Sequence, residues 1–236
     1  INACDKVLAM GYILEPNWKD NFSLTNENSR EAILAAIFSE SDTNKENQLH
    51  LNSLHYKQNL VYGAPFGAWN GLCAQPDYVK LFPEDDPRYE GSFLMGQQYD
   101  LSTGEKILTA YNMDLNYTAE IAMMPGTGYD GTNWGAVLQQ AGYRANKWTY
   151  SSSLNGAMGN DYHVFRLADI YLMKAEALLR SGGSASEATN LVNAVRARAY
   201  GNTNHNYASV TLKEVQLERR LEFAWELTSR QDDIRF

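Results

Sequence analysis

The hydrophobic pattern of the chain changes near Asp161. After this residue, apolar side chains recur every three or four positions, as they do on one face of an α-helix, whereas before it short apolar runs alternate with turn-forming and aromatic residues. We therefore predict a loop-rich part over residues 1–160 and a helical part over residues 161–236. The stripe of the first helix is Leu167, Ile170, Tyr171, Ala175 and Leu178, and it stops at Gly182-Gly183.

Two capping boxes predict two further helices. Ser184 with Glu187, and Thr211 with Glu214, have the form in which a hydroxyl and a carboxylate satisfy backbone N–H groups at the start of a helix. The stripes that follow them are Ala188, Leu191, Val192 and Val195 in the second helix, and Val215, Leu221, Ala224 and Trp225 in the third.

The first two helices are expected to form an antiparallel hairpin of the tetratricopeptide type. Small residues dominate the contact predicted between them, namely Ala168, Ala175, Ala177, Ala185 and Ala188. The third helix is expected to cover this hairpin. Because repeats of this kind bury their apolar faces against neighbouring units, we also expect more helices upstream of Ile1.

The part of the chain before Asp161 is less regular. The run from Ala32 to Phe38 fits a helix capped by Asn28 and Glu31, and it fits a short buried strand equally well, so both alternatives stay open. Residues 62–69 and 126–135 are rich in glycine and aromatic residues, and we predict that both segments are loops.

Composition and charge exclude some classes of partner. The formal net charge is −8, so neither nucleic acid nor an anionic membrane surface is expected to bind, because both require clustered positive charge. No apolar run approaches the roughly 20 residues that span a bilayer. Cys4 is interpreted as a helix residue, and Cys4 and Cys73 lack the spacing of a zinc site.

The charged clusters are interpreted as structural. Glu218, Glu222 and Glu226 lie at i,i+4 spacing with arginines nearby, which favours an ion-pair lattice over an acid–base site, and the same holds for Arg166, Asp169 and Glu176. Asp85-Asp86-Pro87-Arg88 is interpreted as a turn, with calcium binding or glycoside hydrolysis as its alternatives. The motifs of nucleophilic, phosphate-binding and metal sites are missing, so we predict no catalytic residue, metal or cofactor.

Aromatic residues give the strongest indication of a ligand. They make up 12% of the chain, with 15 Tyr and 5 Trp against 8 Phe, a bias toward rings that suit half-wet surfaces and can pack on the C–H faces of sugars. Burial in the core is the alternative for each ring, and we assign Trp18, Trp225 and Tyr171 to the core. The candidate glycan contacts are Tyr62, Phe66, Trp69, Asn70, Tyr89, Tyr129 and Trp134, with Trp148 and Tyr150 as further loop aromatics.

Six segments of the chain match a known family in order. They are residues 166–177 (RLADIYLMKAEA), 188–199, 218–226 and 230–236, preceded by residues 69–79 and 82–88. These segments resemble the signature blocks of the SusD/RagB family of glycan-binding lipoproteins. Trp225 and the Thr228-Ser229 pair depart from the family pattern, which has small residues or glycine near the end of the third helix.

The resemblance implies a mainly α, SusD-like fold with tetratricopeptide-type helix pairs and a loop-rich irregular lobe that contains short strands. It implies that residues 1–160 and 161–236 are parts of one SusD-like unit, and that the family's N-terminal portion and lipidated cysteine lie outside this chain. It also implies an outer-membrane surface location and membrane contact only through a lipid anchor.

The function implied by the resemblance is non-enzymatic capture of a glycan and its delivery to a SusC-type TonB-dependent transporter. A tetratricopeptide-like scaffold that binds a protein or peptide is the alternative. A glycoside hydrolase is the third hypothesis, which the lack of a suitable acid pair disfavours.

Overall fold

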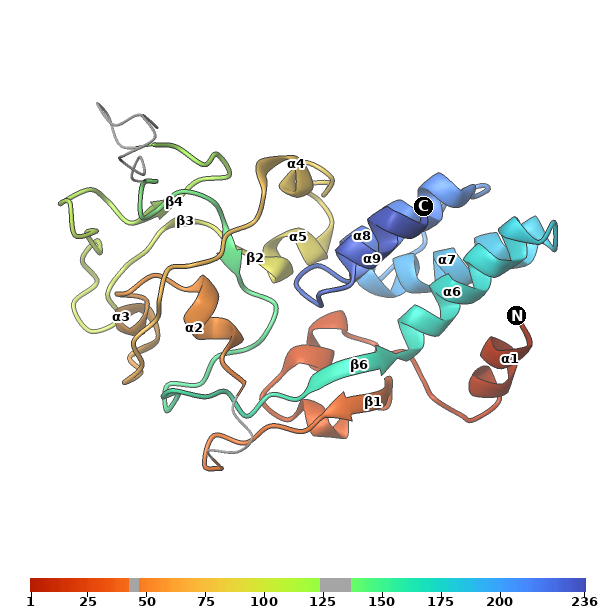
Figure 1. The fold of residues 1–236 in the computed structure, drawn as a ribbon, viewed down its shortest axis with the longest axis horizontal. Helices are drawn as coiled ribbons and strands as arrows, with labels where there is room; N and C mark the ends of the chain where they lie inside the picture. The colour runs from red at the N-terminus through yellow and green to blue at the C-terminus, as the bar shows by residue number, and fades with distance from the viewer. Residues whose placement is uncertain (43–46, 124–136) are drawn as a thin grey trace. The chain divides into compact units, whose positions relative to one another are not determined.

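The computed structural model describes residues 1–42, 47–123 and 137–236, which form two compact units (Figure 1). Unit 1 consists of Ile1–Ile37, Phe82–Tyr89 and Asn160–Phe236, and unit 2 consists of Phe38–Leu81 and Glu90–Gly159. The described residues are rich in helix and contain only short strands, which confirms the mainly α fold class.

Unit 1 holds the long helices. Its elements in chain order are α1 (Asn2–Leu8), the 3-10 helices η1 (Trp18–Phe22) and η2 (Asn26–Asn28), β1 (Ala32–Ala36), β6 (Tyr162–Arg166), α6 (Leu167–Arg180), α7 (Ala185–Tyr200), α8 (Leu212–Glu222) and α9 (Ser229–Arg235). Cys4 lies in α1, as the sequence predicted. None of the helices in the described residues is long and apolar enough to cross a membrane.

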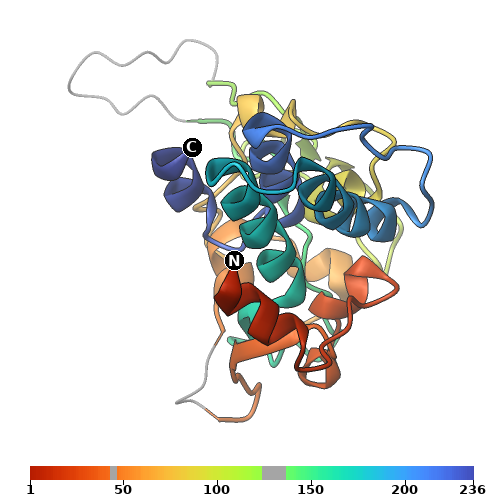
Figure 2. The ribbon, with the colours of Figure 1, turned by 90° about the vertical axis from the view of Figure 1, so that its right-hand side faces the viewer.

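Helices α6 and α7 form the predicted hairpin, and α8 packs against it (Figures 1 and 2). The core between them contains Ala168, Leu172, Ala175, Leu178, Ala188, Val192, Val195, Val210, Val215 and Phe223. Three of the five small residues predicted at this contact are fully buried, whereas Ala177 is half-buried and Ala185 is exposed. Ala185 is exposed because it opens α7, before the helix reaches its partner.

The two predicted capping boxes differ in the structure. Thr211 and Glu214 satisfy each other's backbone groups at the start of α8, as expected. Ser184 accepts a hydrogen bond from the backbone N–H of Glu187, 3.1 Å away, but the Glu187 carboxylate instead pairs with Lys174 of α6 at 2.6 Å. The carboxylate therefore links the two helices of the hairpin.

Helix α8 ends at Glu222, one turn earlier than the hydrophobic stripe predicted. The backbone of Trp225 has φ +66° and that of Leu227 has φ +60°, both in the left-handed region that favours glycine. This conformation gives a physical reason for the small residues that the SusD/RagB pattern has here. Trp225 is half-buried, whereas Trp18 is buried and Tyr171 packs on the helical core, as predicted.

The segment that the sequence left open is a strand, but it is half-buried, with Leu34 exposed, and not the buried strand that was considered. Residues Ala32–Ala36 form β1, which pairs antiparallel with β6, and irregular register on either side of Leu34 bends the pair. Strand β6 leads directly into α6, so this pair anchors the start of the hairpin.

Unit 2 is built from short elements joined by long loops. It contains α2 (Leu49–Ser53), α3 (Asn59–Tyr62), α4 (Pro76–Val79), the end of α5 (Pro87–Ser92), β2 (Phe93–Leu94), β3 (Gly96–Gln97), β4 (Asn116–Tyr117) and β5 (Arg144–Ala145). Strand β2 pairs with β5, and β3 pairs with β4. Ile107, Leu115 and Tyr117 form a small hydrophobic core in this unit.

Candidate functional site

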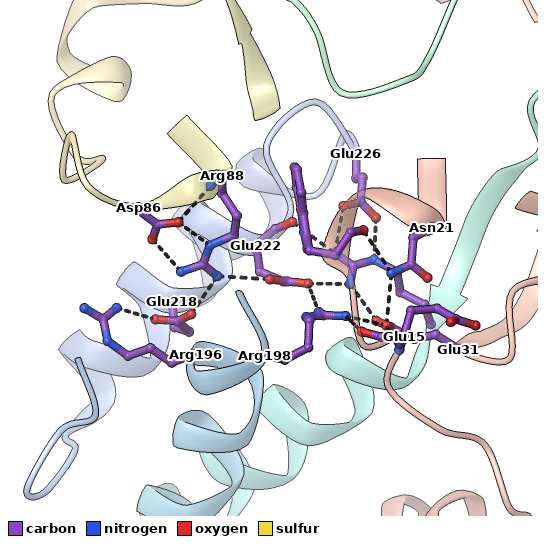
Figure 3. A network of polar contacts seen from close by, with 12 residues as sticks. Glu15, Asn21, Glu31, Asp86, Arg88, Arg196, Arg198, Glu218, Glu222 and Glu226 are labelled. Atoms are coloured by element: carbon purple, nitrogen blue, oxygen red, sulfur yellow. Dashed lines mark hydrogen bonds and ion pairs between the residues drawn. The ribbon is translucent and has the colours of Figure 1, made fainter. Parts of the chain in front are cut away.

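Several carboxylates of unit 1 form a buried ion-pair network with arginines (Figure 3). Arg166 meets Glu31 at 2.8 Å, Glu222 at 2.5 Å and Glu226 at 2.9 Å, and all four side chains are at most 5% exposed. Glu222 also contacts Arg88 at 3.0 Å and Arg198 at 2.5 Å. This confirms the interpretation of the charged cluster around α8 as a structural lattice.

The turn at Asp86 belongs to the same network. Its carboxylate accepts hydrogen bonds from the backbone N–H of Arg88, at 2.9 Å, and from two nitrogens of the Arg88 guanidinium. Arg88 in turn reaches Glu218 at 2.7 Å. Asp86 therefore closes a turn, as the sequence indicated, and both oxygens of its carboxylate accept hydrogen bonds from Arg88.

Arginine neighbours hold these carboxylates in the ionised state. Burial by itself raises the pKa of a carboxyl group, but Arg198, Arg166 and Arg88 outweigh it at Glu222 and lower its pKa to about 2. Arg198 and Arg166 likewise outweigh burial at Glu31 and lower its pKa. Neither group can hold a proton for catalysis near neutral pH.

The predicted aromatic residues have unequal exposure. Trp69 is 50% exposed, whereas Phe66 is only 4% exposed and packs edge-on against His50. Tyr62 is half-buried, and its ring lies 5.1 Å from that of Tyr150, centroid to centroid. Phe66 is therefore too buried to present a ring face to a ligand, and it packs with His50 and Tyr62.

The other candidate glycan contacts do not lie together. Asn70 lines a pocket of unit 2, described below. Tyr89 is half-buried in unit 1, with its ring 6.4 Å from that of Phe82. Tyr129 and Trp134 lie outside the described residues. Trp148, a further loop aromatic, is buried at 3% exposure.

A pocket of about 390 Å³ opens in unit 2. Its described lining consists of Tyr56, Asn70, Gly71, Cys73, Tyr111, Ile121, Val137, Leu138, Gln139, Ala141 and Arg144. Tyr56 is 52% exposed and Tyr111 is 50% exposed, so both rings keep a free face. Half-exposed rings beside amides and a guanidinium suit a polar ligand that has apolar faces.

The loop before Cys73 lies against helix α2 and fixes one wall of the pocket. The backbone N–H of Asn70 donates to the carbonyl of Leu54 at 2.9 Å, and that of Gly71 donates to the carbonyl of Asn52 at 2.9 Å. Asn70 has φ +54°, a left-handed conformation that asparagine tolerates better than most residues. The conformation sets the side chain at the pocket wall.

Arg144 of β5 joins this loop to the opposite wall. Its guanidinium donates to the side-chain oxygen of Asn70 at 2.9 Å, to the carbonyl of Leu72 at 3.3 Å and to the carbonyl of Gln139 at 2.8 Å. The guanidinium carbon lies 5.2 Å from the centre of the Tyr117 ring. Arg144 therefore ties the loop that carries Asn70 to the segment that carries Gln139.

His55 fixes the orientation of Gln139. The ring Nδ1 of His55 accepts from the backbone N–H of Lys57 at 3.1 Å, so its Nε2 carries the proton and donates to Oε1 of Gln139, also at 3.1 Å. The same oxygen accepts from the backbone N–H of Ala110 at 3.0 Å. The amide oxygen of Gln139 is thus engaged, and its NH2 group is the half of the amide left for a ligand.

Sequence reasoning missed Tyr56, Tyr111, Gln139 and Arg144 of this lining. Tyr111 stands beside Asn112, which has φ +57°, so the rule that placed aromatic residues in turns would have found it. Arg144 and Gln139 carry no local signal. They reach Asn70 and His55 across 74 and 84 residues of sequence, which no spacing rule can predict.

Gly142 is expected to be essential to the pocket wall. It has φ +75°, and a Cβ atom there would lie 2.6 Å from both Cβ and Sγ of Cys73, which lines the pocket. Gly104 has φ +71° with nothing within 4 Å, so Gly104→Ala is a matched control for backbone strain alone. We expect Gly142→Ala to lower the free energy of unfolding by about 1–3 kcal/mol more than Gly104→Ala, measured by urea denaturation. Equal losses would contradict the close packing of Gly142 on Cys73.

Comparison with known proteins identifies the family. The sequence model of the SusD family matches residues 30–236, so the chain belongs to that family. A SusD-like protein of Bacteroides ovatus is 26% identical over 229 residues, which are 95% of this chain and 37% of the relative.

Solved structures share the fold. Surface glycan-binding protein A from Bacteroides fluxus has a TM-score of 0.71 at 17% identity, covering 99% of this chain and 46% of that one. The protein of the same name from Bacteroides thetaiotaomicron, in complex with laminarihexaose, has a TM-score of 0.70 at 18% identity, covering 99% and 49%. The chain therefore spans less than half the length of each of these relatives.

Proposed function

We propose that the chain captures an oligosaccharide in the pocket of unit 2 without cleaving it. The observation that carries the proposal is the juxtaposition of two half-exposed rings, Tyr56 and Tyr111, with amide donors on Asn70 and Gln139. Sugar rings present C–H faces that pack on aromatic planes and hydroxyls that bond to amides. Relatives with this fold are named as surface glycan-binding proteins, which supports the same ligand class here.

Binding without chemistry is supported by where the carboxylates lie. Hydrolysis of a glycosidic bond requires two carboxyl groups about 5–9.5 Å apart on either side of the bond. The described lining of the pocket contains neither Asp nor Glu. In unit 1, the buried carboxylates of Glu31 and Glu222 are paired with arginines.

Trp69 extends the proposed binding surface. It is half-exposed and directly precedes Asn70 in the loop held against α2. Tyr62 is a secondary candidate because it is only partly accessible, and Phe66 is withdrawn because it is buried. Contacts of a glycan with Tyr89, Tyr129 and Trp134 stay predictions.

Family membership supports a proposal about location and partner. We propose that the complete protein lies on the outer-membrane surface, held by a lipid anchor, and passes its glycan to a SusC-type TonB-dependent transporter. Purification of the full-length protein from its native membrane tests both points, because the transporter should copurify with it. Recovery in the soluble fraction without any such transporter would contradict this proposal.

Removing one pocket ring is expected to weaken glycan binding about tenfold. Tyr56→Ala and Tyr111→Ala each remove one stacking plane, worth about 1–1.5 kcal/mol, while Tyr→Phe at the same positions keeps the plane. Tyr99→Ala is the matched control, because Tyr99 is also 50% exposed in unit 2 but does not line the pocket. Titration calorimetry over a glycan panel measures the effect. An equal loss in Tyr99→Ala, or no binding to any glycan, would refute the proposed site.

A further inference from the structure

Arg144 is the only charged residue in the described lining of the pocket. Its side chain is 3% exposed, and its hydrogen-bond partners are all neutral oxygens. Its Nε is buried with no partner among the described residues. By contrast, the buried Arg88 and Arg166 of unit 1 each meet three carboxylates.

A buried cation without a carboxylate is costly. Taking an ion out of water is compensated only when an opposite charge or a full set of hydrogen bonds replaces the water. The face of Tyr117 supplies a partial compensation at Arg144. The positive charge of the pocket wall is therefore not neutralised by the described residues, in a chain whose formal net charge is −8.

The two amides of the lining are oriented to donate. The side-chain oxygen of Asn70 is engaged by Arg144, and that of Gln139 is engaged by His55 and Ala110. Within residues 1–42, 47–123 and 137–236, neither NH2 group has a hydrogen-bond partner, so both can donate to a ligand. The pocket wall thus offers donors and a positive charge, which together fit a ligand group rich in acceptors and negatively charged.

His55, which orients the Gln139 amide, is kept neutral mainly by burial. Burial lowers the pKa of His55 to about 4, against the raising effect of its hydrogen bond to Gln139, and the charges of Arg144 and Lys57 act in the same direction as burial. His55 is therefore neutral at pH 7 and keeps the proton on Nε2 that orients Gln139.

We infer that the pocket selects a sugar residue carrying an anionic group, a uronic acid carboxylate or a sugar sulfate, with the ring packed on Tyr56 or Tyr111. This inference rests on the proposed function and adds the ligand class. The anionic group would lie beside Arg144 and accept from the NH2 groups of Asn70 and Gln139. A neutral glycan leaves the charge of Arg144 uncompensated.

Matched ligand pairs test the inference on the unaltered chain. Oligogalacturonate is compared with its methyl ester, an oligosaccharide containing glucuronic acid with its methyl ester, and a sulfated galactan oligosaccharide with its desulfated form. In at least one pair, the charged member is expected to bind about tenfold more tightly at low salt. This advantage is expected to shrink several-fold between about 20 and 300 mM NaCl.

The outcomes separate the two proposals. If uncharged members bind as tightly as charged ones, the anionic preference is refuted and glycan capture stands. If no member of these pairs binds but other neutral glycans in the panel do, the inference is likewise refuted. If no glycan binds at all, both proposals fail. If the charged member binds more tightly only in the carboxylate pairs, the ligand is a uronic acid. If it does so only in the sulfate pair, the ligand is a sulfated sugar.

One substitution tests whether Arg144 is the source of the preference. Gln139→Glu keeps an oxygen for the bonds from His55 and Ala110, and it adds a negative charge to the residue whose backbone carbonyl accepts from Arg144. The ratio of affinities for the charged and uncharged members is expected to fall about tenfold. Asn155→Asp is the control, because Asn155 is exposed, does not line the pocket and gives the same change in net charge. An equal fall in both variants would attribute the preference to overall charge and overturn the inference.

Discussion

Replacing Arg166 with methionine is expected to lower the free energy of unfolding by about 3–5 kcal/mol, because the change leaves buried carboxylates without their cation. Arg166 is 1% exposed and binds Glu31, Glu222 and Glu226 at 2.5–2.9 Å. Methionine keeps much of the apolar stem of arginine. The decrease in the free energy of unfolding therefore measures the effect of removing the positive charge. Urea denaturation followed by the helical circular dichroism signal measures it, since the long helices all belong to unit 1.

Arg220→Met is the control for this prediction. Arg220 directly follows Arg219 in α8, its side chain is 28% exposed, and it pairs with Asp233, which is 51% exposed. Exposed pairs contribute about 0–1 kcal/mol, so this variant is expected to stay close to the unaltered chain. Similar losses in Arg166→Met and Arg220→Met would show that the network adds no more than surface pairing.

A second substitution tests whether the network acts as a unit. Glu226→Gln removes one of the carboxylates that Arg166→Met orphans, so the double variant is expected to be less destabilised than the sum of the two single variants. Strict additivity would argue against coupling between the two groups.

The sequence predicted that these charged residues form ion pairs, but it did not predict all the residues that take part. The spacing of Glu218, Glu222 and Glu226 predicted carboxylates on and just after α8 and indicated arginine partners. Glu31, however, meets Arg166 across 135 residues, and Arg88 meets Glu218 across 130. Local spacing determines which side chains share one face of a helix. The tertiary fold determines which distant residues pair with them.

The pocket shows the same division between local and long-range information. Asn70 was found because it lies in a short motif with glycine, and its left-handed backbone is a local property. Phe66 was placed wrongly because its loop composition is that of an exposed segment, while His50 packs on its ring from elsewhere. Rings beside glycine and proline indicate a loop, but their burial depends on contacts distant in sequence.

Acid is expected to destabilise unit 1 through Glu222. Its folded pKa is about 2, because Arg198, Arg166 and Arg88 outweigh the effect of burial, against 4.5 as its ordinary value. Since the folded pKa is lowered, the unfolded chain takes up the proton first as the pH falls. The stabilisation is therefore complete above pH 4.5 and is lost between about pH 4.5 and 2, by on the order of 3 kcal/mol. Glu31, whose pKa is also lowered, adds to the same loss.

The Glu222→Gln variant separates the acid-induced loss of stability that comes from Glu222 from the loss that comes from the histidines. Burial lowers the pKa of His50 and of His55 to about 4 from 6.5, so their share of stability disappears in a higher window, between about pH 6.5 and 4. Below pH 4, the unfolding free energy of Glu222→Gln is expected to fall less steeply than that of the unaltered chain, although this variant is less stable at pH 7. Glu27→Gln, at an exposed position outside the network, is expected to keep the original slope. Urea denaturation at half-unit steps from pH 7 to 2 measures all three slopes, and an unchanged slope in Glu222→Gln would show that the arginines do not hold this carboxylate ionised.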